Sequence, residues 1–130
     1  MTAIPDGYED LFIRPLFGDL ATVRPDGAPA VTPMWFMWDG ELLKFTHTTK
    51  RQKVRDIAHE PRIAMSVIDP DNPHRYLQVR GTVESIEPDP TGAFYVELSK
   101  RYGNVDPQPP ADSPDRVVIS VRPFTYTKRG

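Results

Sequence analysis

Residues 18–47 read GDLATVRPDGAPAVTPMWFMWDGELLKFTH. This stretch holds three apolar or alternating runs, and the turn sequences PDG and DG separate them. Such runs are typical of antiparallel strands, because the glycine of an Asp-Gly pair readily adopts the positive φ that tight turns need. The stretch therefore predicts a β-meander with strands over residues 18–24, 28–38 and 41–47.

Three further segments have strand character, namely RIAMSVID (62–69), RYLQVRGTVESIE (75–87) and RVVISVRPFTY (116–126). Helical spacing is confined to residues 50–60 and 91–103. Gly81 predicts a bulge or corner in its strand. We expect a mainly β fold: a six-stranded antiparallel split β-barrel with two or three short helices, since closing a barrel removes the exposed edges of a meander.

Length and composition exclude several classes of protein. The 130 residues suit one domain over 1–130, with residues 1–10 as an N-terminal extension. A net charge of −2 does not support bulk binding of nucleic acid, and the absence of cysteine excludes disulfides and thiolate chemistry. No apolar run is long enough to span a membrane and no signal peptide is evident, so we expect a cytoplasmic protein.

The stretch THTTKRQKVRD, residues 46–56, predicts an anion site. Thr49 and Gln52 have capping-box spacing, which predicts a helix beginning at Lys50. Its first turn would then carry cations, although each costs about 0.3–1 kcal/mol at this end of a helix dipole. Hydroxyl and cationic groups together suit a phosphate; the candidates are Thr46, Thr48, Thr49, Arg51 and Lys53. The alternative is a solvated basic face of the helix.

Two other segments are candidates for ligand contacts. The run Thr32-Pro33-Met34-Trp35 contains a proline, which predicts an edge or bulge where backbone groups are free to meet a flat ring. The same run is apolar on both faces, and a subunit interface would also explain it. In the later strand, Tyr76, Gln78 and Arg80 alternate onto one face, which is either a wet barrel face or a surface that contacts a ligand in another protomer.

No residue is predicted to be catalytic, and no metal site is expected. The three histidines lack metal-ligand spacing, and we interpret them as ordinary polar residues. Nothing resembles a protein-borne nucleophile or base, so the chemistry would come from a bound cofactor.

These motifs, in this order, resemble a known family. The segment from Leu20 to Ile86 resembles the pyridoxamine 5′-phosphate oxidase-like split β-barrel superfamily and, within it, the oxidoreductases that use the deazaflavin coenzyme F420. The similarity covers residues 11–126, nearly the whole chain. The resemblance implies a homodimer with cofactor sites at the interface. The resemblance implies that the cofactor phosphate is held by Thr46, Thr48, Thr49, Arg51, Lys53 and, less specifically, Lys50. It places Thr32, Pro33, Met34 and Trp35 beside the tricyclic ring. It also implies that Arg75, Tyr76 and Gln78 contact the cofactor from the second subunit.

The function implied is hydride transfer from the reduced deazaflavin to a small unsaturated acceptor. Three alternatives stay open: a flavin mononucleotide oxidase or flavin reductase, a non-catalytic protein that binds the coenzyme, and a plain dimeric scaffold. No membrane or nucleic-acid partner is expected. The acceptor leaves no trace in the sequence, because an apolar pocket without charged anchors has no motif.

Overall fold

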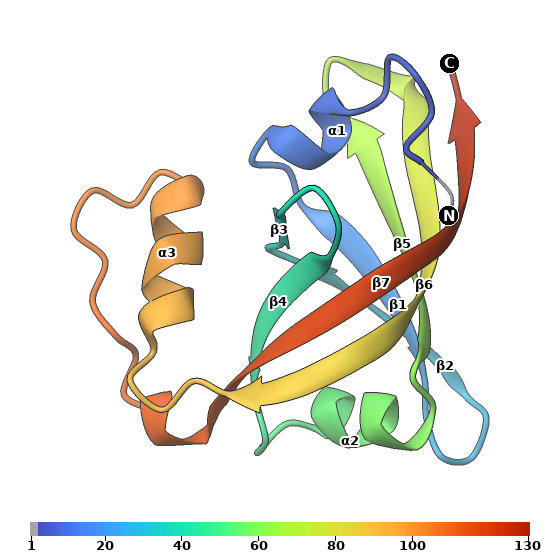
Figure 1. Ribbon diagram of the computed structural model, residues 1–130. Helices are drawn as coiled ribbons and strands as arrows, with labels where there is room; N and C mark the ends of the chain where they lie inside the picture. The colour runs from blue at the N-terminus through green and yellow to red at the C-terminus, as the bar shows by residue number, and fades with distance from the viewer. Residues whose placement is uncertain (1–2) are drawn as a thin grey trace.

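The chain forms one antiparallel sheet of seven strands in a computed structural model, which describes residues 3–130 (Figure 1). The strands run in the spatial order β2-β1-β5-β6-β7-β4-β3. Their bounds are β1 Gly18–Val23, β2 Pro29–Met34, β3 Met37–Trp38, β4 Leu43–Thr48, β5 Arg62–Asp69, β6 Asn72–Pro88 and β7 Arg116–Arg129. The helices are α1 Asp10–Ile13, α2 Gln52–His59 and α3 Ala93–Arg101, with a 3₁₀ turn at Ser113–Asp115.

The expected mainly β architecture is confirmed, but the strand number is seven rather than six. The run predicted as one strand over 28–38 breaks at Trp35 and Phe36, which leave the ladder between β2 and β3. The break has a physical reason. The side chain of Phe36 is fully buried, while its N–H and C=O bond to α3 side chains instead of a neighbouring strand. The two strands on either side of the break then form opposite ends of the sheet.

Glycines and prolines lie where the turn chemistry predicts. Gly27 and Gly40 have φ of 87° and 96° in the two hairpin turns. The pairing of β6 with β7 shifts register at Gly81, and a Cβ there would lie 2.7 Å from a methyl of Val121. Pro33 lies in β2, an edge strand, so its missing N–H breaks no ladder bond on the open side.

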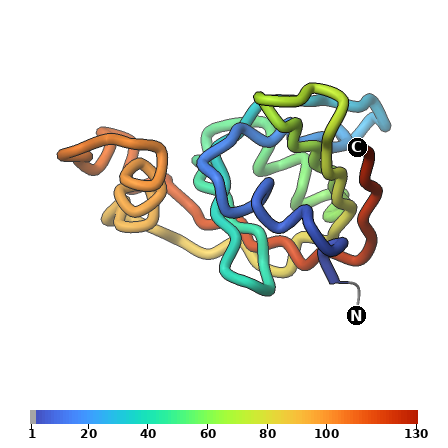
Figure 2. Tube along the Cα trace, turned by 90° about the horizontal axis from the view of Figure 1, so that it is seen from above, coloured from blue at the N-terminus to red at the C-terminus, as the bar shows by residue number. Residues whose placement is uncertain are grey.

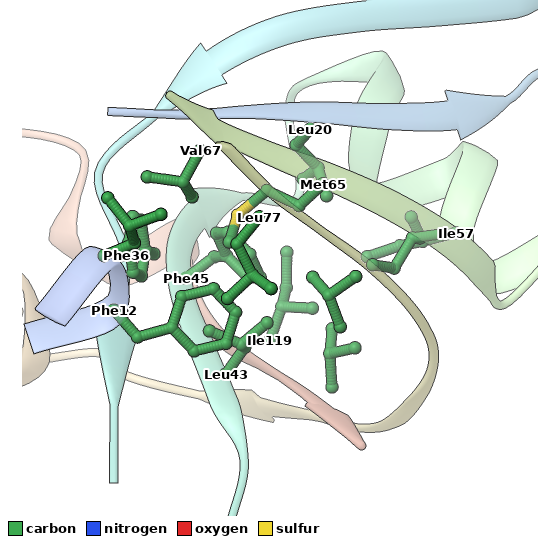
Figure 3. Packing of buried hydrophobic residues seen from close by; sticks show 14 of the residues in the cluster. Phe12, Leu20, Phe36, Leu43, Phe45, Ile57, Met65, Val67, Leu77 and Ile119 are labelled. Carbon is green, nitrogen blue, oxygen red and sulfur yellow. The ribbon is translucent and has the colours of Figure 1, made fainter. Parts of the chain in front are cut away.

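The core fills the inside of the curved sheet. Phe12, Phe36 and Phe45 gather there with Leu43, Met65 and other aliphatic side chains (Figure 3). Phe12 comes from α1, an element that the sequence did not predict. α1 closes one end of the barrel, and α2 lies at the other (Figure 1).

The predicted start of α2 is wrong by two residues. The helix begins at Gln52 rather than Lys50, and no described side chain caps it. Thr49 is not the N-cap because its N–H and hydroxyl both donate to the carbonyl of Asp115, at 3.0 and 3.4 Å. Gln52 bonds forward to Asp56 at 2.9 Å, so the capping box does not form.

α3 stands beside the barrel with the loop that follows it, as the view from above shows (Figure 2). The helix falls within the segment predicted for it, and Gly103 ends it with a φ of 94°. Of the three helices within residues 3–130, none has the length and apolar content to cross a membrane.

Candidate functional site

A buried lysine lies at the centre of the basic region. Lys53, in the first turn of α2, is 8% exposed. Its ammonium donates to the hydroxyl of Thr22 on β1 at 3.4 Å, and no carboxylate of residues 3–130 forms an ion pair with it. Burial lowers the pKa of Lys53, and the nearby charge of Asp56 opposes that shift. A buried cation without a paired anion is costly, and a bound phosphate would offset the cost.

Two more basic residues face the same region from neighbouring strands. His47 in β4 is partly buried; burial, followed by the charges of Lys53, Arg116 and Arg51, lowers its pKa to about 4. Arg116 opens β7 opposite Thr48, and one of its nitrogens lies 3.4 Å from the hydroxyl of Thr46. The cluster thus draws on β4, α2 and β7.

The turn between β4 and α2 carries the remaining predicted phosphate residues. Thr48 is buried, and its hydroxyl accepts the N–H of Lys50 at 3.2 Å. Thr49 is tied to Asp115, as described above. Lys50 and Arg51 are exposed to solvent. These two cations lie in the turn rather than in the helix.

A shallow hollow of about 250 Å³ lies next to the basic cluster. Its lining consists of Phe17, Pro33, Met34, Trp35 and Thr46. Three of the four residues predicted to run beside the ring are therefore together, whereas Thr32 is exposed on β2 and does not line the hollow. Thr46 belongs to both features, since it lines the hollow and meets Arg116. An apolar hollow that continues into a cationic cluster can hold a flat ring carrying a phosphate.

The amino-acid sequence matches the family described as pyridoxamine 5′-phosphate oxidase over residues 4–129. The chain belongs to this family. One curated member, the pyridoxine/pyridoxamine 5′-phosphate oxidase of Kineococcus radiotolerans, is 31% identical over 99 residues, which are 76% of this chain and 43% of the relative. The chain thus spans less than half the length of that oxidase.

Solved structures give two further comparisons. A protein named F420 reductase is 64% identical, with a TM-score of 0.93, over 95% of this chain and 98% of its own. General Stress Protein 26 of Bacillus anthracis is 25% identical, with a TM-score of 0.71, over 93% of this chain and 89% of its own. The split-barrel fold of the oxidase family is therefore shown.

The residues expected to reach across from a second subunit lie on β6, outside the hollow. Leu77 and Val79 point into the core, so Tyr76 and Gln78 occupy the opposite, partly exposed face. Arg75 is engaged within its own chain: it pairs with Asp10 at 2.6 Å and with Asp69 at 2.9 Å. Its guanidinium therefore binds α1 and the residues just before it within the same chain.

Several residues of the site are not predicted by any sequence pattern. Arg116 was not singled out because nothing in the sequence gives the register that sets it opposite Thr48. His47 was interpreted as ordinary, since its setting depends on cations from three different elements. Phe17 precedes the first strand and belongs to no motif, so its aromatic character is the only signal of it in the sequence.

Proposed function

We propose that the chain is a coenzyme F420-dependent oxidoreductase acting on a small unsaturated acceptor. The observation that carries the proposal is the continuity, through Thr46, of an apolar hollow with a basic cluster. The cluster includes Lys53, a buried lysine that forms no ion pair within residues 3–130. The 64% identity to a protein named F420 reductase supports the choice of coenzyme.

In this proposal the residues have distinct roles. Lys53, Thr46 and Arg116 would hold the phosphate, and Pro33, Met34 and Trp35 would border the ring. Lys50 and Arg51 are exposed and would meet the carboxylates of the coenzyme's oligoglutamate tail. When bound in its reduced form, the deazaflavin supplies the hydride. The chain itself would orient the ligand and exclude water, and the proton that completes reduction of the acceptor would come from solvent or from the coenzyme.

A homodimer is part of the proposal. β2 is an edge strand whose residues are mostly exposed, with Val31 at 68%. A second copy would cover this apolar surface and would bring the other protomer's Tyr76 and Gln78 near the hollow, as the family resemblance implies.

The second candidate is a flavin mononucleotide enzyme. It is favoured by the match to a relative named pyridoxine/pyridoxamine 5′-phosphate oxidase. Flavin mononucleotide shares the ring, the ribityl chain and the first phosphate with the deazaflavin, so one cluster would serve both. The two cofactors differ in the central ring, where the deazaflavin has carbon in place of a flavin nitrogen, and in the lactyl-oligoglutamate tail that the deazaflavin adds.

Titration of the purified protein with each cofactor, followed by tryptophan fluorescence, tests the proposal. We expect tighter binding of coenzyme F420, and oxidation of the reduced coenzyme with at least one enone or quinone of a panel. Tighter binding of flavin mononucleotide would select the second candidate. Tight binding without turnover on any acceptor would indicate a protein that stores the coenzyme, and binding of neither would refute both enzymes.

A further inference from the structure

Two consecutive residues at the end of α3 hold the place where the aromatic run breaks. Arg101 donates to the carbonyl of Phe36 at 2.9 Å. The same guanidinium donates to the carbonyls of Phe12, Ile13 and Arg14 at 2.9, 2.7 and 2.9 Å. One side chain thus ties the end of α1 to the segment between β2 and β3, in a partly buried position where lost bonds are costly.

Tyr102 also binds the segment between β2 and β3 to the end of α3. Its hydroxyl accepts the N–H of Phe36 at 3.0 Å and donates to the carbonyl of Leu16 at 2.6 Å. Both backbone groups of Phe36 are therefore satisfied by α3 rather than by a strand. Burial raises the pKa of Tyr102, so the hydroxyl keeps its proton and donates at neutral pH.

The ring of Tyr102 packs against two residues that line the hollow, Trp35 and Phe17. It stacks on Trp35 with centroids 4.9 Å apart and planes inclined by 11°. It also meets Phe17 edge-on at 5.9 Å. Trp35 and Phe17 are two of the five residues that line the hollow. Aromatic pairs of this kind contribute about 0.5–1.5 kcal/mol beyond burial of area.

We propose that Tyr102, held in place with Arg101, is a positioning residue that sets the aromatic walls of the hollow for the cofactor ring. The proposal rests on the proposed function for the identity of the ring ligand. α3 stands beside the barrel (Figure 2). It then has a defined role, because the residue at its end fixes the orientation of Trp35. Tyr102 itself does not line the hollow, so it acts through Trp35 and Phe17.

The test uses the full chain with Trp38→Phe, so that Trp35 is the remaining tryptophan. In this background we expect Tyr102→Leu to make Trp35 emission more sensitive to acrylamide. Affinity for coenzyme F420 or flavin mononucleotide should fall by about three- to tenfold, the range for loss of an aromatic pair. Affinity for inorganic phosphate should stay unchanged. Tyr102→Phe should restore the protection of Trp35, and Lys100→Ala, an exposed neighbour on α3, is the matched control.

Each result decides the matter. Unchanged quenching of Trp35 in Tyr102→Leu overturns the proposal, and so does an equal loss of affinity for phosphate and for the ring ligand, because that indicates general damage to the fold. If the parent protein binds neither cofactor, the proposed function fails, while increased quenching in Tyr102→Leu still supports Tyr102 as the residue that sets the walls.

Discussion

At the scale of single residues, Lys53 is the most unusual feature of the molecule. Its ammonium is buried with one hydroxyl partner, 3.4 Å away, and no ion pair within residues 3–130, and such burial of a charge costs free energy. Residues that oppose stability in this way are common at sites where function requires them.

Lys53→Met should therefore separate stability from binding. We expect the free energy of unfolding to stay level or rise, because the buried charge is removed and the volume is kept. Cofactor affinity should weaken by about 1–3 kcal/mol, the range for losing a charged hydrogen-bond partner. Denaturant unfolding and fluorescence titration measure the two quantities. Arg55→Met is the control, since Arg55 is exposed on the same helix; equal binding by both variants would remove Lys53 from the site.

His47 makes a pH-dependent contribution. Its ordinary pKa of 6.5 falls to about 4 in the folded chain, so between these values the unfolded chain binds a proton that the folded chain does not. Stability is then retained above pH 6.5 and declines as the pH falls toward 4. Bound phosphate should raise the pKa of His47 by adding negative charge.

We predict that His47→Gln flattens the decline in melting temperature between pH 6.5 and 4, relative to the parent chain. NMR titration of the imidazole with and without cofactor measures the expected rise in its pKa. His59→Gln, at an exposed position in α2, should leave the decline intact. A parent-like pH profile in His47→Gln would show that other groups control it.

At the scale of elements, α1 is attached by charges as well as by its buried Phe12. Arg75 bonds to Asp10, Asp69 and the carbonyl of Gly7, and it lies 4.9 Å from the ring centre of Tyr8. Its hydrogen bond to Asp10 lowers the pKa of that carboxyl. The ion pair with Asp10 is thus present above pH 3.8 and is lost only in stronger acid.

Arg75→Gln distinguishes two roles for Arg75: attachment of α1 within the chain, and contact with the cofactor across subunits. If Arg75 serves α1, the variant should melt at a lower temperature and be cleaved faster by protease within residues 3–14, with cofactor affinity retained. Mass spectrometry of timed digests and a binding titration measure both effects. A loss of affinity with normal protease resistance would instead favour the cofactor contact across subunits that the family resemblance implies.

At the scale of the whole molecule, the open edge of β2 controls assembly in our proposal. Val31→Lys should convert a dimer to a monomer, because a charge on an edge strand opposes pairing with another chain. Size-exclusion chromatography with light scattering measures the mass. Val105→Lys, 99% exposed in the loop after α3, should not alter it. Persistence of a dimer in Val31→Lys would assign the interface to another surface.

Most of the strands, the hairpin turns, the bulge at Gly81 and the existence of α2 and α3 follow from local signals. These signals are alternating apolar residues, Asp-Gly turns and helical spacing. Each depends on a few neighbouring residues, so it can be recognised in the sequence alone. The same holds for the threonines and cations of residues 46–53. These residue types suit an anion whatever the exact start of the helix.

Only the tertiary structure decided how distant segments meet. The break at Trp35 and Phe36 depends on hydrogen bonds from α3, some 65 residues away in sequence. Arg116 reaches Thr46 through the register of β7 with β4. Packing buries Lys53 against Thr22, with no ion pair in the described part of the chain. Register, burial and the pairing of charges are properties of the packed chain, and local sequence does not encode them separately.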